Sequence, residues 1–192
     1  MSAINRLAVY CGSSSGKDPA YLAEARRLGA IMAERRIDLV YGGGKLGLMG
    51  AIADAVLAGG GRVYGVIPSA LVSYEVAHEG LTELHEVADM HQRKARMTEL
   101  ADAFLCLPGG IGTLDELAEA WSWNALGYHH KPFCLFDQGG YWHRFLQFCD
   151  HVRDEGFMSE ARRSRLLSAG TLEEALAKLE AAASTASDGP VW

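Results

Sequence analysis

The sequence lacks the features of a membrane or secreted protein. Its 192 residues contain no apolar run long enough to span a bilayer. The N-terminal segment has one arginine and a short apolar run, without the longer hydrophobic stretch of a signal peptide. Basic residues are fewer than acidic ones, 18 against 24, which gives a formal net charge of −6. This balance argues against non-specific binding to nucleic acid or membranes, and we expect a cytoplasmic protein.

The sequence also lacks the residue spacing of a metal centre or a disulfide framework. None of the four cysteines forms a CxxC pair, and the seven histidines do not cluster into a ligand set. Three of the cysteines lie in apolar runs, so we expect buried, reduced thiols. The four are Cys11, Cys106, Cys134 and Cys149.

Strand-like apolar runs alternate along the chain with amphipathic helix-like segments. This alternation predicts an α/β protein with a parallel sheet covered by helices on both faces. We expect one domain over residues 1–183 and a flexible tail over 184–192, without repeats or linkers. The expected strands are 7–11, 39–41, 63–67, 84–87, 103–107 and 132–136. The expected helices are 19–36, 48–57, 90–101, 113–126, 141–155, 159–167 and 171–183.

Ligands of such sheets bind beyond the carboxyl ends of the strands, near the point where the strand order reverses. Four loops follow expected strands and are rich in glycine or polar residues: 12–17, 42–47, 68–80 and 109–113. The functional site is therefore expected among these loops.

The most informative motif is PGGIGTLDE, residues 108–116, which ends a strand and opens a helix. Its glycines let backbone N–H groups approach an anion without interference from a Cβ atom. The helix N-terminus adds unpaired N–H donors and a partial positive charge, so the motif favours a phosphate as its ligand. Thr113 can cap the helix or donate its hydroxyl to that phosphate. The alternative is a tight turn with an ordinary threonine cap.

Glu116 lies about one turn into the same helix. A carboxylate beside a bound phosphate is unfavourable unless it stabilises a developing cation or activates water. Cleavage of a glycosidic bond passes through an oxocarbenium-like state that needs such a carboxylate. An ordinary first-turn glutamate is the competing interpretation.

The segment MHQRKARM, residues 90–97, places three cations on one expected helix. Arg93 shares a face with Met97 and lies three residues before Arg96. A guanidinium presents a planar fork that suits phosphate or carboxylate. The alternative is a basic face exposed to solvent.

Two other glycine-rich loops resemble nucleotide motifs incompletely. GGGKLGLMG, residues 42–50, contains GxGxxG, but no acidic residue ends the next strand, which argues against NAD or FAD. GSSSGKD, residues 12–18, misses the P-loop spacing by one residue and has Asp18 in place of serine or threonine, which argues against ATP hydrolysis. The polar loop over residues 12–18 is still expected to line a nucleotide pocket.

The segments CGSS, GGGKLGLMG, MHQRKARM and PGGIGTLDE, in this order, resemble the LOG (lonely guy) family of cytokinin riboside 5′-monophosphate phosphoribohydrolases. Members were often labelled lysine decarboxylases. The resemblance covers about residues 5–180, and the pairing of MHxRKxxM with PGGxGTxxE is highly specific. It implies a Rossmann-like, doubly wound sheet, usually in a homodimer. It also implies hydrolysis of AMP or N6-modified AMP to free base and ribose 5-phosphate, with no metal or organic cofactor.

The resemblance assigns the catalytic pair to Arg93 and Glu116. It implies that Lys94 binds substrate, together with a glutamate of the preceding loop, which is Glu75 or its rival Glu79. The remaining substrate-binding positions implied by the family are Gly109, Gly110, Ile111, Gly112, Thr113, Leu114, Asp115 and Ser122.

In the implied mechanism, the amides of residues 109–113 bind the 5′-phosphate. Glu116 stabilises the cationic ribose and orients or deprotonates water. Arg93 positions the substrate and Glu116, and stabilises charge near the leaving base. Many relatives have threonine where Ser122 stands, and Asp115 replaces a common glutamate, a change we expect to matter little.

Two other functions compete with this one. Lysine decarboxylation with pyridoxal phosphate needs a Schiff-base lysine and a large two-domain scaffold, which this chain does not offer. A non-catalytic nucleotide-binding or carrier protein on the same fold is the stronger rival, because a fold does not by itself imply chemistry. The combination of Arg93 with Glu116 favours catalysis.

Overall fold

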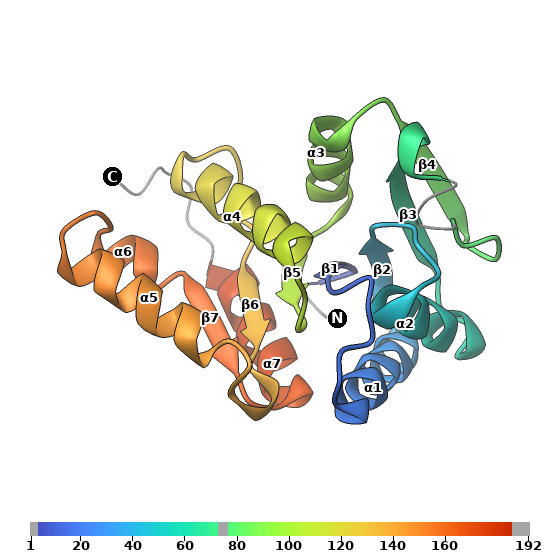
Figure 1. The fold of residues 1–192 in the computed structure, drawn as a ribbon, viewed down its shortest axis with the longest axis horizontal. Helices are drawn as coiled ribbons and strands as arrows, with labels where there is room; N and C mark the ends of the chain where they lie inside the picture. The colour runs from blue at the N-terminus through green and yellow to red at the C-terminus, as the bar shows by residue number, and fades with distance from the viewer. Residues whose placement is uncertain (1–3, 73–76, 186–192) are drawn as a thin grey trace.

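The computed structural model, which describes residues 4–72 and 77–185, shows a parallel seven-stranded sheet with helices on both faces (Figure 1). The strands are β1 Arg6–Tyr10, β2 Asp38–Tyr41, β3 Val63–Pro68, β4 Glu83–Val87, β5 Ala103–Cys106, β6 Phe133–Phe136 and β7 Leu166–Ala169. The helices are α1 Pro19–Arg35, α2 Gly47–Ala58, α3 Met90–Leu100, α4 Ile111–Ala125, α5 His143–Asp154, α6 Glu160–Arg163 and α7 Leu172–Thr185. Short 3-10 turns cover Ser69–Leu71 and Gln138–Gly140.

The strand order is β4-β3-β2-β1-β5-β6-β7, and every pairing is parallel. The chain winds outward from β1 to β4 and then returns to the other side of β1 with β5. This is the doubly wound, Rossmann-like arrangement that the sequence predicts. The order reverses between β1 and β5, so the carboxyl ends of these two strands mark the expected ligand site.

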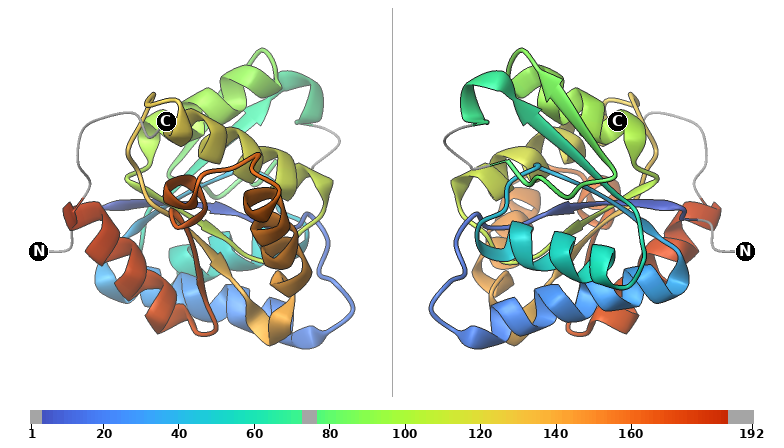
Figure 2. Two further views of the ribbon diagram at one scale, coloured as in Figure 1. Left: turned by 90° about the vertical axis from the view of Figure 1, so that its left-hand side faces the viewer. Right: turned by 90° about the vertical axis from the view of Figure 1, so that its right-hand side faces the viewer.

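Side chains of the strands alternate between two apolar layers. In β1, Leu7 and Val9 enter the core that α1, α2 and α7 cover, whereas Ala8 and Tyr10 enter the core under α3, α4 and α5. Figure 2 shows these two groups of helices on opposite faces of the sheet. Because both faces are buried, the central strands are mostly apolar, whereas the edge strand β4, with sequence ELHEV, alternates with polar residues and is partly exposed.

Helix α1 begins and ends as its sequence predicts. The carboxylate of Asp18 accepts a hydrogen bond of 2.9 Å from the amide of Ala20, and Pro19 occupies the first turn. The helix ends at Arg36, which adopts a left-handed conformation with φ 58°. Leu28 and Met32 are fully buried against the sheet.

The segment predicted as a helix over residues 159–167 is the main error of the secondary-structure prediction. Only one helical turn, α6, forms there, and the chain then enters the unpredicted strand β7. Strand β7 pairs with β6, with Leu166 opposite Phe133 and Ala169 opposite Phe136. A four-residue edge strand is too short to show a period of its own, so the pairing with β6 decides its conformation.

All four cysteines are buried and free, as predicted. Burial raises the pKa of the Cys134 thiol to about 12. No helix in the described part of the chain combines the length and hydropathy that crossing a membrane requires. Ser184 and Thr185, which were expected to belong to the tail, form the end of α7, and the rest of the expected tail lies outside the described residues.

Candidate functional site

A cavity of about 330 Å³ lies at the carboxyl ends of β1 and β5, where the strand order reverses. The loops after β1, β2, β3 and β5 border it, which are the four loops singled out from the sequence. The 3-10 turn after β3 contributes Leu71. Six predicted site residues line the cavity, namely Arg93, Gly110, Ile111, Gly112, Thr113 and Glu116.

The glycine-rich loops that border the cavity are hydrogen-bonded to one another through their backbones. The amide of Gly12 donates to the carbonyl of Pro108 at 3.1 Å, and the amide of Leu48 donates to the carbonyl of Gly12 at 3.1 Å. A Cβ atom on Gly109 would lie 2.9 Å from the Gly12 nitrogen. Glycine at position 109 is therefore required by the close approach of two backbones.

Helix α4 presents its unpaired N-terminal amides to the cavity. Its N-cap is Gly110, which makes no side-chain capping bond, so the first-turn amides have no acceptor within the helix. A Cβ atom on Gly110 or Gly112 would meet nothing within 4 Å, because both glycines face open space. The helix dipole adds partial positive charge at this point. The arrangement suits an oxyanion such as phosphate.

The start of α4 differs from the prediction by two residues. The helix begins at Ile111, so Thr113 is its third residue and does not cap it. Thr113 is buried, and a Cβ atom on Gly109 would lie 2.1 Å from its hydroxyl oxygen. Of the two roles considered for Thr113, the helix cap is therefore wrong, while Thr113 does line the cavity.

Arg93 lies in the first turn of α3 and is only 4% exposed. Its Nη2 donates a hydrogen bond of 2.9 Å to the carbonyl of Gly42 at the end of β2. A Cβ atom on Gly42 would lie 2.0 Å from that nitrogen, so glycine at this position makes room for the guanidinium. The interpretation of Arg93 as part of a solvent-exposed basic face is wrong.

Glu116 is also buried and lies over the carboxyl ends of β1 and β5. Burial is the largest cause that raises the pKa of Tyr10, Cys11 and Cys106 beneath it, and the charge of Glu116 raises these values further. The neighbouring thiols and phenol are therefore held in their protonated forms. They offer neither a thiolate nor a phenolate to the site.

Lys94 does not line the cavity, although it follows Arg93 directly. Its Nζ lies 3.0 Å from a carboxylate oxygen of Asp115 and 2.8 Å from one of Glu119. Burial disfavours the charged form of Lys94, but the two carboxylates outweigh this effect and the pKa of the ammonium is raised. Lys94 and Asp115, both predicted to bind substrate, therefore form an ion pair with each other.

Other predicted residues also lie apart from the main cavity. Gly109 lines an adjoining cavity of about 280 Å³, where its carbonyl accepts a hydrogen bond of 2.6 Å from the hydroxyl of Tyr141. Leu114 packs against the core under α3 and α4, and Ser122 is exposed further along α4. Glu79 is exposed. Glu75 lies outside the described residues.

Several cavity residues were not named individually from the sequence, although Ser13 and Leu71 lie in loops expected to form the site. Met49, Leu71 and Met90 supply apolar surface, and Ser13 adds a hydroxyl. Met49 and Met90 each lie in the first turn of a helix that follows a strand. Their position could have predicted this role, because the first turns of α2 and α3 lie at the same edge of the sheet as the loops before them.

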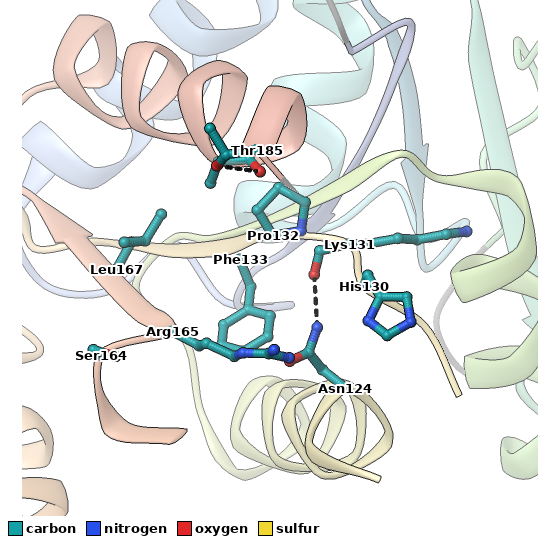
Figure 3. Close-up of a pocket in the computed structure, with 10 residues that line it drawn as sticks. Asn124, His130, Lys131, Pro132, Phe133, Ser164, Arg165, Leu167 and Thr185 are labelled. Atoms are coloured by element: carbon teal, nitrogen blue, oxygen red, sulfur yellow. Dashed lines mark hydrogen bonds between the residues drawn. The ribbon is translucent and has the colours of Figure 1, made fainter. Parts of the chain in front are cut away.

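A second cavity, of about 240 Å³, lies by the starts of β6 and β7, at the opposite end of these strands (Figure 3). Asn124 donates to the carbonyls of His129 and Lys131 at 3.2 and 3.3 Å and accepts a bond of 2.8 Å from Arg165. The Lys131 ammonium points away toward the carbonyl of Thr98 at the end of α3. These polar groups hold the loop before β6 in place, so this cavity is not the candidate site.

The described residues contain no group of three or more His, Cys, Asp or Glu side chains arranged to hold a metal ion. The charged side chains that line the main cavity are those of Arg93 and Glu116, beside an array of amides. Such a set can bind an anion and stabilise positive charge near it.

The chain matches known proteins along most of its length. Residues 49–182 match the family described as "Possible lysine decarboxylase". The chain is 50% identical to the cytokinin riboside 5′-monophosphate phosphoribohydrolase LOG7 of Arabidopsis thaliana over 179 residues. This matched stretch is 93% of this chain and 82% of that protein. Identity to the enzyme LOG of Oryza sativa subsp. japonica is 46% over 191 residues, 100% of this chain and 79% of that protein.

Solved structures share the fold at lower identity. The molybdenum cofactor binding protein of Rippkaea orientalis is 19% identical with a TM-score of 0.69, over 92% of this chain and 95% of that one. The molybdenum cofactor carrier protein of Chlamydomonas reinhardtii is 18% identical with a TM-score of 0.70, over 94% and 98%. At this identity only the Rossmann-like fold is shared. The motifs and the identity to the two plant proteins show that the chain belongs to the LOG family of cytokinin riboside 5′-monophosphate phosphoribohydrolases.

Proposed function

We infer that this protein hydrolyses the N-glycosidic bond of N6-modified adenosine 5′-monophosphates and releases the free base and ribose 5-phosphate. The observation that carries this function is that three groups line one cavity. They are the N-terminal amides of α4, the guanidinium of Arg93 and the carboxylate of Glu116. A volume of about 330 Å³ is within the usual range of small-ligand sites. The identity to plant phosphoribohydrolases supports the same activity.

The 5′-phosphate is assigned to the N-terminus of α4. The amides of Ile111, Gly112 and Thr113 have no acceptor within the helix and adjoin the cavity. A phosphate here gains both hydrogen bonds and a favourable interaction with the helix dipole. The ribose then extends toward Glu116, and the base toward the apolar surface of Met49, Leu71 and Met90.

The chemistry is assigned to Glu116 and Arg93. As the bond between C1′ and the base nitrogen breaks, its electron pair leaves with the base and positive charge develops on the ribose. The carboxylate of Glu116 stabilises this charge and orients or deprotonates the attacking water, which forms the new C1′–O bond. Arg93 positions the substrate and Glu116, and stabilises charge near the leaving base. The fixed Arg93–Gly42 hydrogen bond supports this assignment, because it pre-sets the guanidinium at the cavity wall.

We also propose that the protein is a homodimer. An apolar surface open to solvent lies along α3 and the end of α4, with a cavity of about 550 Å³. Tyr128, which lines this cavity, is 77% exposed, and Leu126, two residues before it in the chain, is 46% exposed. Large aromatic groups left in water favour association with another surface. Sedimentation equilibrium measures the mass directly, and a monomer at micromolar concentration would contradict the proposal.

The activity is tested by incubating the pure protein with AMP and N6-isopentenyl-AMP and separating the products by chromatography. Release of free base with ribose 5-phosphate supports the hydrolase. Tight binding without turnover would support a carrier, and release of carbon dioxide from lysine would support a decarboxylase. We expect Glu116→Gln nearly to abolish turnover with an unchanged circular dichroism spectrum. We expect Arg93→Ala to lose activity as well, and an unchanged kcat/KM in either variant would contradict its assignment.

A further inference from the structure

The two helices that carry the proposed catalytic pair are joined by one buried cation. In α3, Arg93 lines the cavity and the next residue, Lys94, points to α4. In α4, Glu116 lines the cavity and the preceding residue, Asp115, meets Lys94. Each helix thus contributes one residue to the cavity and a neighbouring residue to an ion pair beside it.

This ion pair is a bridge from one ammonium to two carboxylates. Lys94 contacts Asp115 at 3.0 Å and Glu119 at 2.8 Å, and the two acids are four residues apart on the same face of α4. Without the cation, two like charges at this spacing would repel each other. Glu116 lies between them in sequence, so the bridge contacts the turn of helix that carries the proposed catalytic carboxylate.

The arm of the bridge between Lys94 and Glu119 is shielded from water more than an ordinary surface ion pair. The side chain of Lys94 is 10% exposed and that of Glu119 is 17% exposed, whereas that of Asp115 is 52% exposed. Exposed pairs contribute little, but loss of one partner of a buried pair leaves an uncompensated charge inside the protein. Helix α3 is therefore expected to shift relative to α4 when the bridge is broken.

We propose that Lys94 is a positioning residue that binds Asp115 and Glu119, holds Arg93 and Glu116 in register across the cavity, and does not contact the nucleotide. The proposal rests on the hydrolase function inferred above. It replaces the substrate-binding role that the family resemblance implies for Lys94. Misplacement of a catalytic group by about 1 Å can cost about 100-fold in rate, so a small helix shift would be visible in kcat.

The first test separates a bridge from a substrate contact by comparing both sides of the ion pair. We expect Lys94→Met to lower kcat by about 10-fold to 100-fold and to leave KM within about twofold. The double variant Asp115→Asn with Glu119→Gln keeps Lys94 and should show the same loss. Adding Lys94→Met to that double variant should cost nothing more. A raised KM in Lys94→Met, with normal kinetics in the double carboxylate variant, would overturn the proposal.

Two controls distinguish positioning from a general loss of stability. Lys94→Arg can still reach both carboxylates and should retain activity within about threefold of the unmodified protein. Asp154→Asn breaks the exposed 2.9 Å pair with Arg153 at the end of α5, away from both the cavity and the proposed dimer surface, and should leave kcat and KM unchanged. An Arg variant as impaired as Lys94→Met would show that the bridge is not what Lys94 provides.

Binding gives a readout that does not depend on turnover. In a Glu116→Gln background, titration calorimetry with AMP should give the same Kd with Lys94 or Met at position 94. A Kd raised tenfold or more by Lys94→Met would assign Lys94 to the nucleotide and overturn the proposal. If Lys94→Met does not fold, the single variants Asp115→Asn and Glu119→Gln test the positioning role instead. A lowered kcat with an unchanged KM in these variants supports the proposal, and normal kinetics in both overturns it.

Failure of the proposed function can be told apart from failure of this proposal. If the unmodified protein hydrolyses neither nucleotide, the function is wrong, and a crystal structure of Lys94→Met then tests the bridge alone. Movement of the Arg93 guanidinium off the carbonyl of Gly42 supports the proposal. An intact 2.9 Å bond to Gly42 with α3 and α4 in unchanged positions overturns it.

Discussion

Substituting Gly42 by alanine should displace the guanidinium of Arg93, with a smaller displacement of Met49, whose sulfur would lie 3.2 Å from the new Cβ atom. The new Cβ atom would lie 2.0 Å from Nη2 and 3.1 Å from Cζ of Arg93. To reach ordinary contact at 3.4 Å, the guanidinium must retreat by roughly 1.4 Å. It then loses its 2.9 Å bond to the Gly42 carbonyl. Because Arg93 is buried, it cannot move into solvent to relieve the contact.

The effect on activity follows from that displacement. A catalytic group moved by about 1 Å can lose about 100-fold in rate, so we expect kcat/KM of Gly42→Ala to fall by about two orders of magnitude. Loss of a hydrogen bond to a charged group costs about 1.5–3 kcal/mol of stability. Replacing glycine by alanine restores about 0.4–1 kcal/mol through the unfolded chain. The free energy of unfolding should therefore fall by only about 1–2 kcal/mol, and the protein should remain folded.

The assay is steady-state release of adenine from AMP, paired with urea unfolding of the same preparation. Gly170→Ala is the matched control, because a Cβ atom there meets nothing within 4 Å and the residue lies far along the chain from the site. It should leave both activity and stability unchanged. Gly42→Ala with normal kcat/KM would refute the reasoning, since the guanidinium position would then not matter. Loss of activity that only mirrors unfolding would refute it equally.

The remaining predictions concern the phosphate loop and pH. Tyr141→Phe removes the 2.6 Å hydrogen bond to the Gly109 carbonyl. Losing about 1 kcal/mol of phosphate binding should raise KM for AMP about fivefold with little change in kcat. An equal rise in KM for adenosine, which has no phosphate, would show that the effect does not come from the phosphate loop. Burial, followed by the charge of Lys131, lowers the pKa of His129 to about 4. Between pH 6.5 and 4 this histidine is therefore protonated in the unfolded chain but neutral in the folded protein. The free energy of unfolding should fall by about 3 kcal/mol as pH drops through this window. Urea unfolding at several pH values should show that slope and its loss in His129→Asn; an equal slope in the variant would assign the effect to other groups.

The position of the site was predictable from the sequence because it depends on a rule about sheets. Loops 12–17, 42–47 and 109–113 each follow an apolar strand, and parallel strands place their carboxyl ends at one edge. Glycines at these ends marked where the backbone must pass close to a ligand or another loop. Nothing in the sequence paired β1 with β5, which are separated by about a hundred residues, except the general handedness of such folds.

The errors arose where long-range contacts decide local structure. Strand β7 has four residues and takes its conformation from β6, so its own sequence carries little signal. Helix α4 begins at Ile111 and Gly112, ahead of the predicted threonine cap, because the turn at Gly110 already orients the first amides. The bridge from Lys94 to Asp115 spans 21 residues and two helices, beyond the reach of spacing rules that apply within one helix.

The backbone bonds that connect Pro108, Gly12 and Leu48 have a consequence for how this enzyme family can diversify. These contacts join the platform under the phosphate to the first turn of α2, peptide group to peptide group. Lengthening one loop would break its bond to the next and disorder the whole anion platform. New substrate preferences should therefore arise by exchanging side chains such as Met49 and Leu71 at the rim, while the glycine loops keep their lengths.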